Sequence, residues 1–240
     1  MNYVRCAAFI AAAGWCSAQA AFALAQTDLN DCNNVYLHQN MDRAIAACTR
    51  LIDEIPKNMQ DGLYVNRGIA HKDARQFEEA LADFNTALEL SPRLAGALHE
   101  RLDLYEKTGE FDKAIADAAR ELEIEPNDPM ALDDRCRSRA EANKELDAAL
   151  ADCELALKLD PSGHPGWRAF VKLRQGKFAD AIADYDAAIK MYPKSQYFWF
   201  GRGIAKLRTG ETAGGNADIA AAEAIKSDVR ATFARCGIAP

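Results

Sequence analysis

The sequence has none of the short motifs that organise common catalytic sites. It contains no Gly-x-Ser-x-Gly motif, no His-Glu-x-x-His motif and no phosphate loop ending in Gly-Lys-Ser/Thr. Its four histidines are scattered, and no Cys-x-x-Cys occurs, so a metal site is not expected. We therefore predict a protein that is not an enzyme and that needs no cofactor.

The sequence also lacks an excess of positive charge. Its net charge is −7, with 29 Lys and Arg against 36 Asp and Glu, so we expect no nucleic-acid partner. The charge is uneven, because residues 78–160 are acidic and residues 161–240 are basic. Such a distribution is typical of a solvated repeat surface, or of a dipolar molecule that orients its partner.

Long uncharged runs are missing except near the N-terminus. Residues 6–25 carry no charge and follow the single base Arg5, and Ala23-Leu24-Ala25 has the small-x-small pattern that signal peptidase cleaves. We predict a signal peptide over residues 1–25, cleavage after Ala25, and a periplasmic or secreted mature protein. The alternative is an uncleaved membrane anchor, since a run of about 20 residues is long enough to span.

The rest of the sequence contains an internal period. Prolines recur about every 34 residues. They are Pro56, Pro92, Pro126, Pro161 and Pro193. The stretch before each proline has apolar residues at i, i+3, i+4 and i+7, which indicates an amphipathic helix. A second helix precedes it, across a turn marked in some segments by Gly109, Gly176 or Gly210. Each segment is therefore predicted to form a helical hairpin.

These segments resemble the tetratricopeptide repeat, a helix–turn–helix of about 34 residues. The second segment has signature residues at Tyr64, Gly68, Ala80, Phe84, Ala87 and Pro92. The last has Trp199, Gly203, Gly215 and Ala222, with Ser227 in place of the proline. The resemblance implies an all-α fold, a right-handed α-solenoid of about six repeats over residues 26–240.

The repeats are predicted to span most of the mature chain. They are residues 26–58, 61–94, 95–128, 129–161, 162–194 and 195–227. A short capping helix is expected over residues 228–237, with Asp228 as its N-cap and an end near Gly237.

Arginine and aspartate recur at an offset of about 16 residues. The pairs are Arg67 and Asp83, Arg101 and Asp117, Arg135 and Asp152, Arg168 and Asp184, and Arg202 and Asp218. Because this offset places two residues on facing turns of a hairpin, we predict a structural ion pair within each repeat. The alternative is a row of arginines that lines a binding groove. The ion-pair interpretation predicts that Asp83→Ala lowers the melting temperature and leaves binding unchanged.

The cysteines nearly copy this spacing. Beyond the predicted signal the chain has Cys32, Cys48, Cys136, Cys153 and Cys236. Because export permits disulfides, we predict the bonds Cys32–Cys48 and Cys136–Cys153, each clamping one hairpin. Buried thiols that only fill the core are the alternative. Cys236 is left over, either free or as a bridge in a dimer.

The resemblance also implies a concave binding face formed by the first helix of each repeat. In the second repeat this face has Gly62, Val65, Ile69, Lys72 and Asp73, and in the third Gly96, His99, Asp103, Glu106 and Lys107. Towards the C-terminus it has Phe170, Leu173, Arg174, Tyr197, Phe200, Ile204, Leu207 and Arg208. This last set of apolar groups edged by cations predicts a peptide groove. The alternative is that the final helix covers it.

The resemblance therefore implies a non-catalytic scaffold of the bacterial cell envelope that binds a protein or peptide. Val65 and Ile69 stand where a clamp for a carboxylate terminus would need Lys and Asn, so that ligand is not expected. One alternative is a carrier of a small apolar ligand or lipid in the C-terminal groove. Another is an adaptor tethered to the membrane by an uncleaved signal.

Overall fold

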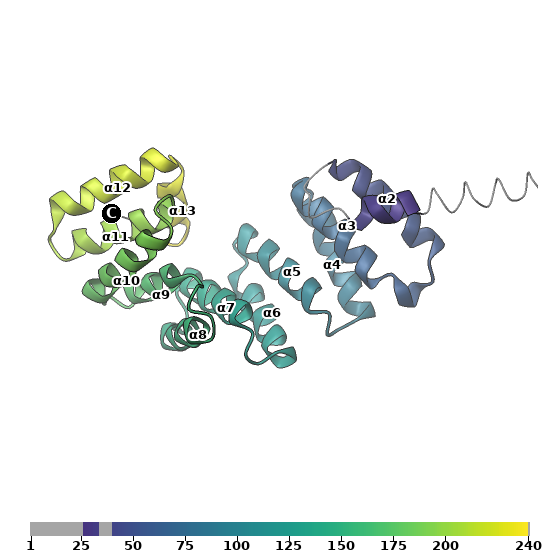
Figure 1. Ribbon diagram of the computed structural model, residues 1–240, viewed down its shortest axis with the longest axis horizontal. Helices are drawn as coiled ribbons and strands as arrows, with labels where there is room; N and C mark the ends of the chain where they lie inside the picture. The colour runs from purple at the N-terminus through teal and green to yellow at the C-terminus, as the bar shows by residue number, and fades with distance from the viewer. Residues whose placement is uncertain (1–25, 34–39, 240) are drawn as a thin grey trace, which may run out of the picture. The chain divides into compact units, whose positions relative to one another are not determined.

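A computed structural model describes residues 26–33 and 40–239, and the predicted signal over residues 1–25 lies outside them (Figure 1). Within the described residues the chain is helical and has no strand, and none of its helices is long and apolar enough to cross a membrane. The chain divides into two compact parts, Met1–Leu104 and Tyr105–Pro240, called unit 1 and unit 2 below.

Unit 1 is built from helices that pack against their neighbours in the chain. Residues 26–33 are helical. They are followed by α2 (Met41–Glu54), the short 3₁₀ helix η2 (Lys57–Met59), α3 (Asp61–Asp73), α4 (Phe77–Leu90) and the start of α5 (Ala95–Thr108). Helix α3 packs against both α2 and α4.

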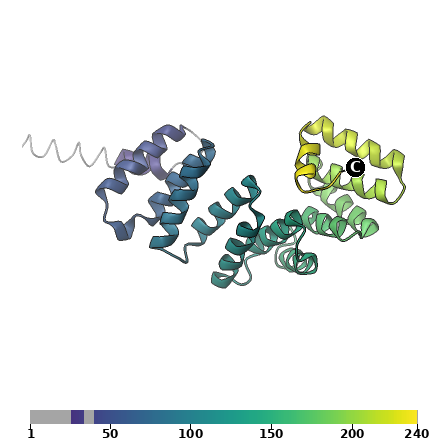
Figure 2. The same ribbon diagram turned by 180° about the vertical axis from the view of Figure 1, so that it is seen from behind.

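Unit 2 continues the same pattern. Its helices are α6 (Phe111–Ile124), α7 (Pro129–Ala142), α8 (Leu146–Leu159), α9 (Pro165–Arg174), α10 (Phe178–Met191), α11 (Gln196–Arg208), α12 (Thr212–Ile225) and α13 (Val229–Arg235). The hairpin partners α7 and α8, α9 and α10, and α11 and α12 pack together, and α9 also contacts α7 and α11 (Figure 2). The first helices of successive hairpins therefore lie side by side.

The turns inside the hairpins need backbone in the left-handed region. Gly109, Gly176 and Gly210 have φ of 81°, 74° and 88°, which glycine adopts without steric cost. Where no glycine is present, Arg75 and Asn143 take positive φ instead, at 62° and 56°. Glycine thus marks only some of the turns, as the sequence showed.

The last hairpin packs closely because two glycines face each other. A Cβ atom on Gly203 of α11 would lie 2.9 Å from the carbonyl oxygen of Gly215 of α12, closer than side chains approach backbone. Gly203 is also buried. These glycines therefore let the two helices approach, and they are packing residues.

Helix α13 differs in one detail from the sequence prediction. Asp228 occupies the N-cap position, but its side chain makes no capping hydrogen bond and instead pairs with Lys226 at 3.1 Å. The C-terminal end of α13 lies near Gly237, as the sequence predicted. Gly237 has φ of 71°, and the N–H of Ile238 donates to the carbonyl of Phe233 at 3.0 Å, which closes the helix as a glycine C-cap does.

Candidate functional site

The described part of unit 1 has a pocket on the face predicted for binding. Its volume is about 400 Å³. It is lined by Asn33, Met59, Asp61, Gly62, Leu63, Val65, Asn66, Leu94 and Gly96. Three of these, Gly62, Val65 and Gly96, belong to the residues that the repeat positions assigned to the concave face. The pocket therefore lies between the starts of α3 and α5, with helix 26–33 contributing one wall.

The chemistry of the pocket is mixed. The side-chain amide of Asn66 donates to the side-chain oxygen of Asn33 at 3.0 Å, so two amide groups lie side by side. Met59 is 65% exposed, and apart from the adjoining residues and the backbone of the same helix no atom lies within 4 Å of a Cβ built on Gly62 or Gly96. The pocket thus offers amides for hydrogen bonds, a flexible apolar side chain and room above two glycines.

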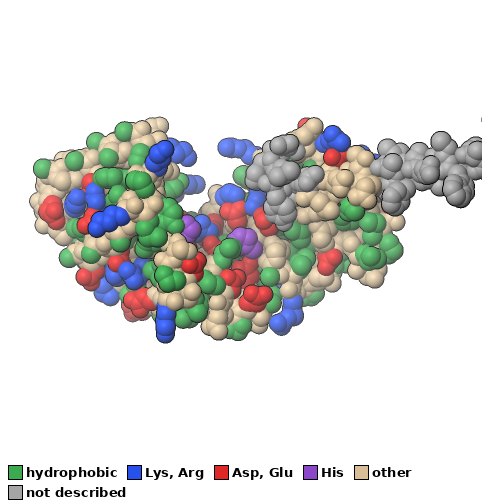
Figure 3. Space-filling view, viewed as in Figure 1, with side chains coloured by type: hydrophobic (Ala, Val, Ile, Leu, Met, Phe, Trp, Pro, Cys, Tyr) green, Lys and Arg blue, Asp and Glu red, His purple; other side chains and the backbone are tan. Residues whose placement is uncertain are grey.

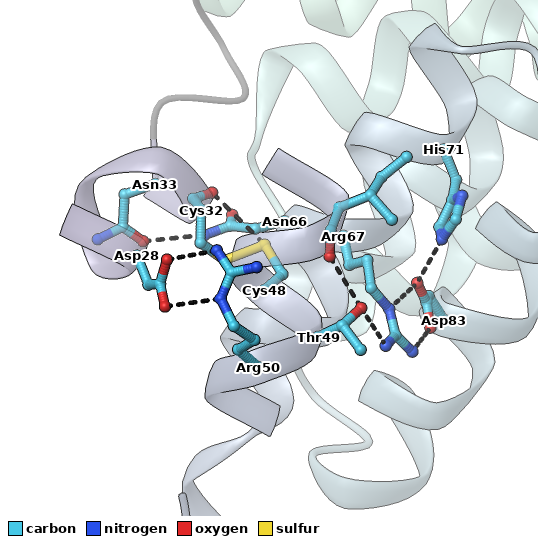
Figure 4. The surroundings of a disulfide bond; sticks show 11 residues. Asp28, Cys32, Asn33, Cys48, Thr49, Arg50, Asn66, Arg67, His71 and Asp83 are labelled. Carbon is cyan, nitrogen blue, oxygen red and sulfur yellow. Dashed lines mark hydrogen bonds and ion pairs between the residues drawn. A yellow bond between two sulfur atoms is a disulfide. The ribbon is translucent and has the colours of Figure 1, made fainter. Parts of the chain in front are cut away.

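The wall that carries Asn33 is fastened to α2 (Figure 4). The neighbouring Cys32 forms a disulfide with Cys48, with the two Cα atoms 4.9 Å apart and both side chains fully buried. Asp28 also accepts two hydrogen bonds from Arg50, at 2.5 and 2.9 Å. Because exposed ion pairs contribute little, the disulfide is the main fastening of this wall.

The predicted ion pair of the second repeat lies beside this disulfide (Figure 4). Arg67 donates through Nε and Nη2 to the two carboxylate oxygens of Asp83, at 2.9 and 2.7 Å. Its remaining nitrogen, Nη1, donates to Thr49 on α2 at 3.1 Å. Arg67 therefore joins α2, α3 and α4, and its guanidinium is not directed into the pocket's lining.

The same geometry recurs in unit 2. The pairs Arg135–Asp152, Arg168–Asp184 and Arg202–Asp218 each have an N–O distance of 2.7 Å and a second hydrogen bond through Nε. Each carboxylate is buried. The fifth predicted pair, Arg101 and Asp117, has one member in each unit and stays a prediction. The four described pairs close hairpins, which favours the structural interpretation over a row of groove-lining arginines.

A second basic residue beside each carboxylate was missed from the sequence. The first helix of each described pair carries another basic residue four positions after the arginine, and it approaches the same aspartate. These residues are His71, Arg139, Lys172 and Lys206. Burial alone would raise the pKa of Asp218, but hydrogen bonds from Arg202 and Lys206 lower it below its usual value. The spacing of an arginine and a second basic residue, Lys, Arg or His, four positions later was visible in the sequence, since residues four apart share a helix face.

The second predicted disulfide, Cys136–Cys153, joins α7 to α8 with Cα atoms 5.5 Å apart. Both cysteines are fully buried, so each of the two disulfides lies in the core of its hairpin. Cys236 is free and partly exposed, and burial raises the pKa of its thiol to about 11. Since the thiolate is the reactive form, this position is poorly suited to oxidation, and the dimer through Cys236 stays a prediction.

The predicted C-terminal groove is not open. Phe170, Phe200 and Ile204 are 5%, 0% and 1% exposed, and they belong to one core cluster with Phe233 of α13. The ring of Phe233 lies 5.7 Å from that of Phe170 and 4.7 Å from that of Phe200. In this structure the predicted groove is therefore covered by the final helix, as the alternative interpretation expected.

The other predicted groove residues divide between core and rim. Leu173 is buried, Leu207 is partly buried, and Tyr197 is 38% exposed. The two predicted groove cations, Arg174 and Arg208, both donate hydrogen bonds to backbone carbonyls after α13. Arg174 donates to the carbonyl oxygen of Cys236, and Arg208 donates to that of Ala239 at 3.1 Å. The apolar surface that a carrier of small ligands would use is thus covered by residues 229–239.

The helical hairpins correspond to a known family. A family model of the tetratricopeptide repeat matches residues 65–129 and 169–229, which together exceed half of the chain. The chain belongs to the tetratricopeptide repeat family. Both the family prediction and the all-α prediction are thereby confirmed.

Solved structures show the same tetratricopeptide fold. A tetratricopeptide repeat protein from Parabacteroides merdae superposes with a TM-score of 0.73 at 18% identity, covering 89% of each chain. YrrB, described as having an unusual peptide-binding site, gives 0.57 at 16% identity, covering 80% of this chain and 98% of its own. MamA also gives 0.57 at 16% identity, covering 72% and 94%. No curated protein sequence matches this chain.

On the face formed by α5 and α7, charged side chains of the protein pair with one another. Figure 3 shows acidic side chains gathered in the region of α5. Within unit 2, Glu106 accepts hydrogen bonds from Arg137 at 2.9 Å and from Ser138 at 2.6 Å. Burial raises the pKa of Glu106 to about 8, against the opposing effects of these two donors. Arg137 also lies over the ring of Trp167, at 5.4 Å. These contacts satisfy the cluster internally, so we assign it no ligand.

Proposed function

We propose that this tetratricopeptide protein is a non-catalytic interaction scaffold and that it binds a peptide segment of a partner protein in the pocket of unit 1. The observation that carries the proposal is the contrast between the two units. The face of α9 and α11 is covered by α13, whereas the face at the starts of α3 and α5 has an open pocket of about 400 Å³.

The groups around the pocket suit a peptide. The amides of Asn33 and Asn66 can each donate to and accept from a peptide backbone, which every peptide offers. Met59 is flexible and polarizable, and such side chains adapt to apolar groups of different shape. The similar fold of YrrB, whose structure is described by its peptide-binding site, supports the same class of ligand.

The two open glycines provide a direct test. Gly96→Leu places a side chain in the pocket, and nothing lies within 4 Å of its Cβ, so no clash is introduced. Removing a glycine from a helix also stabilises it by up to about 1 kcal/mol. A peptide selected on the wild-type protein from a random display library is expected to bind the Gly96→Leu protein at least ~10-fold more weakly. Fluorescence anisotropy measures the change.

The control uses the same substitution outside the pocket. Ala82 is exposed on α4 and is not part of the pocket lining, so Ala82→Leu should leave the affinity of the selected peptide unchanged. Equal loss of binding in both variants would point to non-specific effects. Full binding by the Gly96→Leu protein, or by Gly62→Leu, would place the peptide elsewhere and refute the proposal.

We further propose that the protein acts outside the bacterial cytosol, in the cell envelope. The small-x-small pattern at Ala23-Leu24-Ala25 supports export, and two buried disulfides fit an oxidising compartment. Protein purified from its own cells should have an intact mass that starts at Gln26. A mass that retains residues 1–25 would contradict cleavage and favour the tethered alternative.

A further inference from the structure

Helix α13 sits on unit 2 much as a bound peptide would. Both views place it beside α11 (Figures 1 and 2). Val229 and Phe233, four positions apart, are 0% and 6% exposed, while Arg230, Ala231, Ala234 and Arg235 face solvent. Two side chains on one face of the helix therefore supply nearly all of its apolar contact.

The residues after the helix are held through their backbone. Arg174 donates one amino group to the carbonyl oxygens of Cys236 and Glu141, and Arg208 donates to the carbonyl oxygen of Ala239. A carbonyl is present in every peptide. Arg174 on α9 and Arg208 on α11 could therefore donate hydrogen bonds to the carbonyl oxygens of another peptide segment in the same place.

Helix α13 cannot be stable by itself. It has seven residues, and isolated helices shorter than about 12 residues are marginal in water. Its structure depends on the surface that it covers, formed by Phe170, Phe200 and Ile204. The folding of this segment is therefore coupled to its contact with α9 and α11, as the folding of a disordered peptide is coupled to binding.

The charge of α13 adds a further requirement. The helix has two arginines and no acidic residue. Arg230 pairs with Glu223 of α12 at 2.7 Å, and its guanidinium also lies over the ring of Phe200, at 5.8 Å. Glu223 therefore favours a basic residue at the position of Arg230, whereas Arg174 and Arg208 contact only backbone carbonyls of the occupant.

From these contacts we infer that the face of α9 and α11 is a binding site for a short helix with an aliphatic and an aromatic residue four positions apart and a basic residue directly after the aliphatic one, and that residues 229–239 are its built-in occupant. A partner segment of this chemistry binds by displacing α13. This site is separate from the pocket of unit 1, so the inference does not depend on the proposed function.

The occupant sets the apparent affinity of the site. A tethered segment has an effective concentration in the millimolar range, so it competes strongly with any free peptide. The apparent dissociation constant rises as the fraction of open sites falls. Weakening α13 should therefore strengthen the binding of a peptide added in solution.

The experiment uses the full chain and a defined probe. The probe is a fluorescent synthetic peptide with the sequence of residues 226–239 and the change Cys236→Ser, which prevents oxidation. We expect the full chain with Phe233→Ala to bind this probe at least ~10-fold more tightly than the wild type does. A probe that itself carries Phe233→Ala should bind neither protein. Ala234→Ser, an exposed position on the same helix, is the matched control and should behave as wild type.

Each outcome decides the inference. Equal affinity of the wild-type and Phe233→Ala chains, or no binding by either, overturns it. Combining Phe233→Ala with Gly96→Leu should leave probe binding unchanged, and loss of binding would assign the probe to unit 1 instead. Circular dichroism checks that the variant is folded. If Phe233→Ala unfolds the chain, Val229→Ala removes less of the apolar contact between α13 and unit 2, and it should also increase the affinity for the probe.

Discussion

Replacing Asp83 with alanine is expected to lower the free energy of unfolding by about 3–5 kcal/mol. The Asp83 side chain is 7% exposed, and its two carboxylate oxygens accept hydrogen bonds from Arg67. Nε2 of His71 also lies 3.8 Å from Oδ2 of Asp83. The Arg67 side chain is only 19% exposed, so removing the carboxylate leaves a largely buried guanidinium without its anion. Chemical denaturation followed by circular dichroism measures the loss.

A solvent-exposed pair gives the matched control for Asp83. Lys144 and Asp112 are 55% and 71% exposed, so Asp112→Ala should cost less than about 1 kcal/mol. The Asp83→Ala protein should still bind the peptide selected for the pocket, if assayed well below its melting temperature. Unchanged stability would show that the ladder is not a structural staple, and lost binding by a folded variant would give the arginines a role in recognition.

Removing the Cys136–Cys153 disulfide is expected to destabilise unit 2 by about 3 kcal/mol, the value for a loop of this length. The bond closes 17 residues between α7 and α8, and both cysteines are fully buried. The double variant Cys136→Ala, Cys153→Ala loses this constraint. Thermal unfolding of the variant, compared with the oxidised wild type, measures the effect.

Cys236 supplies the control for the disulfide. Since it is free, Cys236→Ser should leave the stability of the oxidised protein nearly unchanged. The oxidised wild type should gain about 4 Da on reduction, because each of two disulfides takes up two hydrogens. The double variant should gain about half of that. A wild type with all thiols free as purified would contradict both disulfides.

The features predictable from the sequence are those that repeat within one hairpin. The proline period and the apolar spacing before Pro92 or Pro126 predicted the helices because each depends on residues close in sequence. The offset between Arg67 and Asp83 predicted their contact for the same reason. Four repetitions of one pattern carry more information than any single motif.

The features that the sequence left undecided depend on how one hairpin meets another segment. Val229 and Phe233 have helical spacing, but nothing in that spacing says whether the helix extends the stack or turns back onto α9 and α11. The Asn33–Asn66 contact joins residues from different hairpins. It was invisible because neither asparagine lies in a recurring pattern. The second basic residue beside each of these aspartates could have been predicted, since an arginine followed four positions later by Lys, Arg or His recurs in four first helices.

The ladder and the disulfides all close short stretches of chain, and this has a consequence for how the protein acquires its structure. The described pairs are 16 or 17 residues apart, as are the two disulfides. Short loops close at little entropic cost, and chains dominated by local contacts fold quickly. We therefore expect each cysteine to meet its native partner before it meets a thiol from another hairpin. Local folding of each hairpin would then select the correct disulfides, with little need for later rearrangement.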